Sequence, residues 1–81
     1  MKIIITQNNV LVNVDKIITI YPSERGCEDG TYYTIMASLG NCETVRLAKY
    51  SNEKMRDDSL YALTIWLTSP SDDEYYKFQH E

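Results

Sequence analysis

Two groups of adjacent carboxylates are the side chains in this chain whose type and spacing could do chemistry. They are Asp57 with Asp58, and the run Asp72, Asp73 and Glu74. Neighbouring carboxylates can divide general acid and general base work, but adjacent acids far more often form a solvated face. A nucleophile would lack a base beside it, because the one histidine is the next-to-last residue, where chains commonly fray. We therefore predict a protein that is not an enzyme.

No residue pattern predicts a metal or a cofactor. Cys27 and Cys42 have no metal-ligand spacing, and a zinc site would need carboxylates beside the single His80. The three glycines lie in turns, at the wrong spacing for a phosphate-binding loop. A predicted strand of roughly 25 Å separates the two cysteines, which is too far for a disulfide, so we expect reduced thiols.

Size and composition predict one folded domain spanning residues 1–81. Apolar residues make up 43% and charged residues 25%, as in ordinary globular proteins. The formal net charge of −4 repels phosphate, so we expect no direct nucleic-acid partner and instead a protein partner with a basic surface. No run of about 18 apolar residues exists, and "MKIIIT" is too short for a signal peptide. We expect a cytoplasmic protein without membrane contact.

Five strands are predicted in the first half of the chain, where β-branched residues alternate with turn formers. They are Lys2–Thr6, Val10–Val14, Lys16–Tyr21, Thr31–Ser38 and Cys42–Ala48. Pro22 ends the third strand because it cannot donate to a ladder, and "PSERGCEDG" follows as an exposed loop. Gly40-Asn41 is the kind of pair found in two-residue hairpin turns. We expect one curved, antiparallel meander of five strands.

In the second half of the chain the spacing of the apolar residues changes from that of a strand to that of a helix. This change predicts one helix, from Asn52 to Thr68. Ser51 or Asn52 can cap it, and no glycine or proline interrupts it before Pro70. One stripe of the helix is apolar and is expected to pack on the sheet. It consists of Met55, Leu60, Ala62, Leu63, Trp66 and Leu67. The predicted fold class is α+β, with this helix on the five-stranded sheet.

Apolar residues remain after this core is filled. Tyr61 and Ile65 lie four apart on the far side of the helix, near Asp57 and Asp58. They are either ordinary exposed residues or a partner-binding face. The strands also present apolar side chains to both sides of the sheet, with Ile3, Ile5, Val10, Val12 and Val14 on one side and Ile4, Leu11, Ile17, Tyr32 and Met36 on the other. Either the sheet curls into a partial barrel or a second copy covers it, and we favour a homodimer.

The segment 69–81 forms an acidic, aromatic C-terminal tail. Disordered tails usually lack aromatic residues, so its Tyr75, Tyr76 and Phe78 are expected to dock. The tail either folds over the open sheet face of its own chain or forms a surface for a partner. In the second case Asp72, Asp73 and Glu74 join the helix acids and imitate the phosphates that a basic groove binds.

The stretches "MKIIITQNNVLVNVDKIITIY" and "VRLAKYSNEKMRDDSLYALTIWL" resemble a loose group of small uncharacterised proteins from phages and mobile elements of Gram-positive bacteria. The matching residues are Val12, Asn13, Asp15, Ile17, Ile20, Tyr21, Tyr50 and Leu63. The "PSERGC" loop and the acidic tail depart from the pattern. The resemblance implies a mobile-element origin, a setting in which small acidic proteins inhibit host defence nucleases, as anti-CRISPR proteins do. It transfers no catalytic residue.

Together these features predict a non-enzymatic inhibitor that occludes a basic, nucleic-acid-binding surface of a host protein such as a CRISPR nuclease. Its contacts would be Asp57, Asp58, Tyr61, Ile65, Asp72, Asp73, Glu74 and Tyr75. One alternative is a sponge for a small nucleotide signal, which would stack on Tyr32 or Tyr33. A second alternative is a structural or regulatory subunit of a phage complex.

Overall fold

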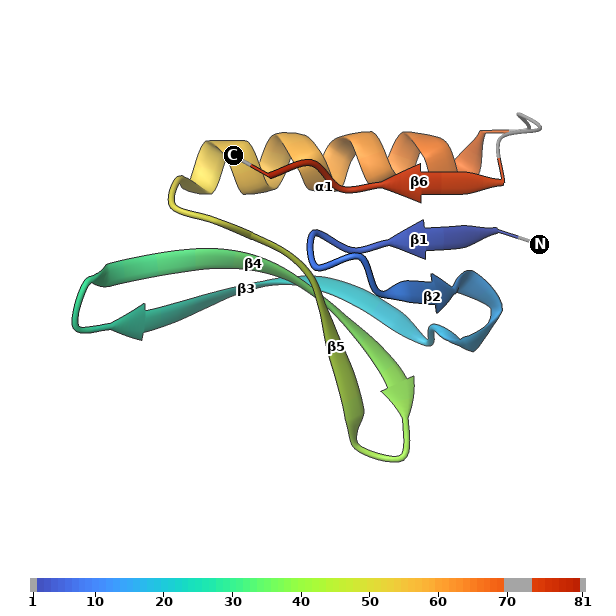
Figure 1. Cartoon of the computed structure of the whole chain (residues 1–81), viewed down its shortest axis with the longest axis horizontal. Coiled ribbons are helices and arrows are strands. Elements are labelled where there is room, and N and C mark those ends of the chain that lie inside the picture. Colours follow the sequence, from blue (N-terminus) through green and yellow to red (C-terminus); the bar gives the residue numbers. More distant parts are fainter. Residues whose placement is uncertain (1, 70–73, 81) are drawn as a thin grey trace.

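Two three-stranded sheets and one helix make up the computed structural model, which describes residues 2–69 and 74–80. The first sheet has the order β2-β1-β6, with β1 at Ile3–Ile5, β2 at Leu11–Asn13 and β6 at Tyr75–Lys77. The second has the order β3-β4-β5, with β3 at Thr19–Cys27, β4 at Gly30–Gly40 and β5 at Glu43–Tyr50. The helix α1 spans Glu53–Thr68. Figure 1 shows α1 and β6 on one side of the molecule and the long β3–β4 hairpin on the other.

The α+β class with one helix is confirmed, but the single five-stranded meander is wrong. The chain does not continue from β2 into a third neighbouring strand. It turns instead through a short 3-10 helix at Val14–Lys16, where the side chain of Asn13 accepts a hydrogen bond of 2.9 Å from the backbone N–H of Asp15. This local side-chain bond competes with ladder pairing. The chain then enters β3, which pairs with β4 and starts a separate sheet.

The predicted loop after Pro22 is also wrong, because β3 continues through it to Cys27. Pro22 lies opposite Ile35 within the ladder. A proline is tolerated there because β3 is the outer strand of its sheet, so its missing N–H leaves no neighbour without a donor. A two-residue turn at 28–29 leads into β4, where Gly30 takes a positive φ of 125°. The result is a β-hairpin nine residue pairs long.

The turn between β4 and β5 lies one residue later than the sequence predicts. Its two central residues are Asn41 and Cys42, with φ of 52° and 62°, and Gly40 pairs with Glu43 across it. Positive φ at both central residues is the mark of a type I′ hairpin turn, whose twist matches that of the flanking strands. Cys42 is therefore a turn residue, and both cysteines are free and exposed.

The helix has the predicted cap but not the whole predicted stripe. The side chain of Asn52 accepts hydrogen bonds from the backbone N–H groups of Lys54 and Met55, at 2.8 and 3.2 Å. Met55 and Ala62 of the predicted stripe are exposed, whereas the buried residues are Arg56, Leu63 and Trp66. The stripe is thus narrower than predicted, and α1 lies mainly against β3, β4 and β5.

One core joins the two sheets and the helix. Its buried apolar residues are Ile4, Val12, Ile35, Ala37, Leu47, Ala48, Tyr50, Leu63, Trp66 and Phe78. Ile4 lies opposite Val12 in the β1–β2 ladder, so these two share the inner face, contrary to the predicted grouping. Because the residues predicted to need a barrel or a second copy are divided between two small sheets, the apolar surplus alone does not require either. No helix of the described residues is long and apolar enough to cross a membrane.

Candidate functional site

The end of the chain docks on its own N-terminus as a strand. β6 pairs with β1 in parallel, with Ile3 opposite Tyr75 and Ile4 opposite Tyr76. The backbone N–H of Ile3 donates to the carbonyl of Glu74 at 2.7 Å, and the N–H of Phe78 donates to the carbonyl of Ile5 at 3.0 Å. Residues 74–80 therefore extend the β2-β1-β6 sheet, which we call the small sheet, at its edge. They do not lie over the face of the β3-β4-β5 sheet. Asp72 and Asp73 lie outside the described residues.

The aromatic residues of this segment separate into inner and outer ones, as alternation along a strand requires. Phe78 is buried, with 2% of its surface exposed, and Tyr76 is half-buried. The ring of Tyr76 lies 5.5 Å from that of Trp66 and 5.1 Å from that of Phe78, centroid to centroid. Tyr75 points outward and is 62% exposed. Two of the three aromatic residues thus belong to the core, and Tyr75 remains available for contact.

A shallow groove of about 420 Å³ runs between the second half of α1 and β6, and we call it the α1–β6 groove. Its lining residues are Ala62, Ile65, Trp66, Ser69, Tyr75, Tyr76 and Lys77. Ile65 is 51% exposed and Tyr75 62% exposed. The structure therefore brings together two predicted contact residues that are ten positions apart in the sequence.

Trp66 also lines this groove but is mostly buried. Its side chain is only 8% exposed, and its indole Nε1 is buried without a hydrogen-bond partner among the described residues. The Nζ of Lys2 lies 4.8 Å from the centroid of the Trp66 ring and donates to the Trp66 carbonyl at 2.8 Å, so the ring is held in place. A buried donor without an acceptor costs about 1–3 kcal/mol. Because this atom is not solvent-accessible, it is not one of the groups that the groove presents.

The outer edge of β6 is open as well. The bonds of Glu74 and Phe78 to β1 show that the even-numbered residues of this segment face β1. Alternate residues of a strand direct their backbone groups to opposite sides, so the N–H and C=O groups of Tyr75 and Lys77 point away from β1. No strand in the described part of the chain pairs with that edge.

The helix acids carry their own counterions. The Nε of Arg56 lies 3.0 Å from a carboxylate oxygen of Asp57, and the Nζ of Lys54 lies 2.8 Å from one of Asp58. The hydrogen bond to Asp58 raises the pKa of the Lys54 ammonium. The predicted acidic surface is thus partly neutralised where the structure describes it, and Glu74 is its one described acid without an ion pair.

The predicted contact residues therefore divide into two sets. Tyr61 is 68% exposed on the helix but is not part of the groove lining, and Glu74 is exposed beside Tyr75. Trp66 and Lys77 were missed as site residues. Trp66 lies in the apolar stripe that the sequence assigns to the core, and only the pairing of β6 with β1 puts Lys77 next to the helix.

The hydroxyl of Tyr76 makes stability depend on pH. Burial raises its pKa above the ordinary value, and the nearby Tyr50 raises it further. The folded state therefore holds the hydroxyl proton more tightly than the unfolded state does. The stabilisation that this proton provides is complete below about pH 10 and is lost as the pH rises above that. Urea unfolding at about pH 9 and about pH 11 should show a smaller loss of unfolding free energy in Tyr76→Phe than in the wild type. Tyr75→Phe, at an exposed position, should behave like the wild type, and equal losses in all three would contradict this assignment.

No protein-family model, curated protein or solved structure matches this chain. Among residues 2–69 and 74–80, His, Cys, Asp and Glu form no group of three or more that could hold a metal ion. The α1–β6 groove presents apolar side chains beside the unpaired edge of β6.

Proposed function

We propose that this chain is a non-enzymatic binding protein that holds an extended segment of a protein partner in the α1–β6 groove and inhibits that partner by occlusion. The observation that carries the proposal is the outer edge of β6, with which no described strand pairs, beside a groove that exposed Ile65 and Tyr75 line.

The mode of binding that suits this groove is strand addition. An extended peptide beside β6 can pair with the backbone groups of Tyr75 and Lys77, while alternate side chains contact Ile65 and Tyr75. Main-chain pairing supplies affinity and the side-chain contacts supply selectivity.

The partner class is a protein with a basic surface, and a nucleic-acid-handling protein such as a CRISPR effector nuclease fits this class. The net charge of −4 supports attraction to such a partner over long range. The Lys54–Asp58 pair is exposed on both sides, and exposed pairs contribute little to stability, so Asp58 can exchange Lys54 for a partner cation at little cost. The acids would then steer the encounter, while the groove supplies the specific contacts.

The test replaces isoleucine by glutamate inside and outside the groove. Ile65→Glu should lose the partner that the wild type captures from a bacterial host lysate, because a charge would be buried against the added strand. Ile18→Glu, at a position 71% exposed and outside the groove lining, should keep it. A photo-crosslinking phenylalanine analogue at Tyr75 should link to the same partner. Equal capture by Ile65→Glu and the wild type would overturn the proposal.

A further inference from the structure

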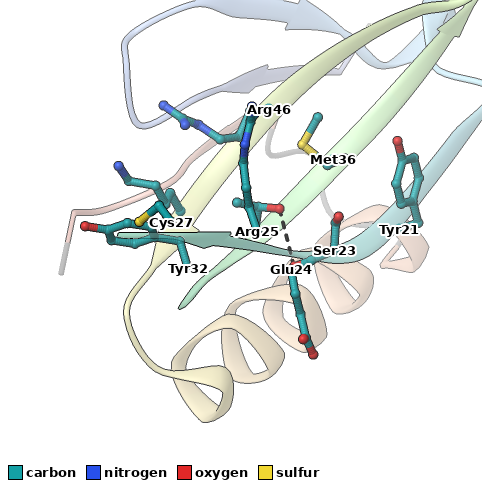
Figure 2. Close-up of a pocket in the computed structure, with 10 residues that line it drawn as sticks. Tyr21, Ser23, Glu24, Arg25, Cys27, Tyr32, Met36 and Arg46 are labelled. Atoms are coloured by element: carbon teal, nitrogen blue, oxygen red, sulfur yellow. Dashed lines mark hydrogen bonds between the residues drawn. The ribbon is translucent and has the colours of Figure 1, made fainter. Parts of the chain in front are cut away.

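The outer face of the β3-β4-β5 sheet carries a second groove, which we call the sheet groove. Its volume is about 600 Å³. Its lining residues are Tyr21, Ser23, Glu24, Arg25, Cys27, Tyr32, Thr34, Met36, Arg46 and Lys49. Figure 2 shows these side chains across the strands, and none of them comes from α1 or from the small sheet.

Strand register explains which residues meet there. In an antiparallel ladder, paired residues point to the same face, and the pairs include Tyr21 with Met36 and Arg25 with Tyr32. Ile35, which directly precedes Met36 in β4, is fully buried on the opposite face. Tyr33 also belongs to that opposite face, since its ring lies 5.5 Å from the guanidinium carbon of Arg56 on α1. Of the two tyrosines predicted to stack on a nucleotide, only Tyr32 lines the groove.

Positive charge collects in this groove although the chain is acidic overall. Arg25, Arg46 and Lys49 are three of its eight basic residues, and all three are exposed. None of them forms an ion pair with a described residue. The one acid of the lining, Glu24, points away from the two arginines in Figure 2. The groove is therefore a cationic site on a protein whose remaining surface carries the excess of acids.

Aromatic rings accompany these charges. The Nζ of Lys49 lies over the Tyr32 ring, 4.5 Å from its centroid, so a cation covers one face of this ring. Tyr21, which is half-buried, contributes a second ring further along β3. Arginine binds phosphate oxygens through two parallel N–H groups, and tyrosine rings stack on nucleobases. A pocket of about 300–1,000 Å³ is the usual size for a small ligand.

We propose that the sheet groove binds a free nucleotide, with phosphate held by Arg25 and Arg46 and the base stacked on the face of the Tyr32 ring that Lys49 leaves open. A small ligand suits the charge distribution better than a nucleic-acid strand. Three cations at one face can neutralise a few phosphates, whereas a longer strand would extend over the acidic surroundings and be repelled. The site is independent of the α1–β6 groove, because the two linings share no residue.

Titration of the isotope-labelled full chain with ADP, followed by amide NMR shifts, tests the site. ADP should cause saturable shifts in β3, β4 and β5. Inorganic pyrophosphate and adenosine should each bind at least about tenfold more weakly than ADP. The double variant Arg25→Ala, Arg46→Ala should lower ADP affinity at least about tenfold, which is a loss of about 1.4 kcal/mol. Lys54→Ala, which removes an exposed basic side chain outside the groove, should leave the ADP affinity unchanged.

Several results would overturn the assignment. They are the absence of saturable ADP shifts, unchanged affinity in the double variant with its amide spectrum still dispersed, and tighter binding of a single-stranded RNA oligonucleotide than of ADP. Adenosine binding as tightly as ADP would remove the phosphate role of the arginines. Pyrophosphate binding as tightly as ADP would remove the stacking role of Tyr32. Tyr32→Leu tests the same role independently and should weaken ADP but not pyrophosphate.

Discussion

Phe78→Ala is expected to remove most of the stability of the protein. The Phe78 side chain is 2% exposed and packs edge-on against Tyr76, at 5.1 Å between ring centroids. Removing a buried phenylalanine ring costs about 3–5 kcal/mol. Domains typically have about 5–15 kcal/mol of stability, and one of this size is expected toward the lower end. Urea unfolding followed by tryptophan fluorescence should show a midpoint shifted strongly toward zero denaturant.

Tyr75→Ala is the matched control on the same segment. Tyr75 is 62% exposed, so its loss should change the unfolding free energy by about 0.5 kcal/mol or less. If Phe78→Ala were as harmless as Tyr75→Ala, the docking of residues 74–80 on β1 would be wrong. The prediction also bears on partner binding. A chain truncated before residue 74 would lose part of its core, so substitutions at exposed positions are better tests of binding than truncation.

Local signals predicted the helix and the first hairpin, because both are specified by residues close together in the sequence. Asn52 supplies the cap, and the turn at residues 7–9 joins two β-branched runs that pair as β1 and β2. No local signal could predict β6. It has three residues, and its partner β1 lies about seventy positions away, with a register that only the folded chain defines. The aromatic content of the segment did indicate that it docks, but not where.

The candidate sites show the same division. Exposure of Ile65 follows from its place on the helix, so a contact role for it was predictable. Its closeness to Tyr75 depends on β6 and was not. The sheet groove was hidden for a further reason, since Arg25 lies in a stretch that Pro22 and neighbouring charges made look like a loop. Once β3 is a strand, the register places Arg25 opposite Tyr32 and Arg46 opposite Met36. Basic side chains that are scattered in the sequence then lie on one face of the β3-β4-β5 sheet.

The two grooves give the small chain two separate means of recognition. The α1–β6 groove offers backbone groups and apolar side chains, whereas the sheet groove offers cations and tyrosine rings. A protein segment fits the first chemistry and a nucleotide fits the second. Since both grooves border the same core, a substitution that loosens the core would weaken both. Binding variants are therefore informative only at exposed positions, and core variants report on the fold.

Gln7 hydrogen-bonds both to β5 of one sheet and to the segment that follows β6 of the other, and Gln7→Met should cost about 1–3 kcal/mol of unfolding free energy. Its side-chain oxygen accepts a bond of 2.7 Å from the N–H of Lys49 on β5, and its Nε2 donates a bond of 2.9 Å to the carbonyl of Gln79. The backbone N–H of Gln7 donates a hydrogen bond of 3.2 Å to the carbonyl of Leu47. Methionine keeps the length of the side chain but leaves the N–H of Lys49 and the carbonyl of Gln79 without partners in a part-buried position.

Hydrogen exchange separates this role from simple packing. The amide of Lys49 should exchange faster in Gln7→Met than in the wild type, relative to amides in the middle of β4, because its acceptor is gone. Gln7→Glu retains an acceptor for Lys49 but cannot donate to Gln79, so it should protect the Lys49 amide while still loosening the end of the chain. Asn8→Ala, at the exposed neighbouring position in the same turn, should leave both amide exchange and stability nearly unchanged. Unaltered exchange of the Lys49 amide in Gln7→Met would mean that the two sheets are held together by their shared apolar core alone.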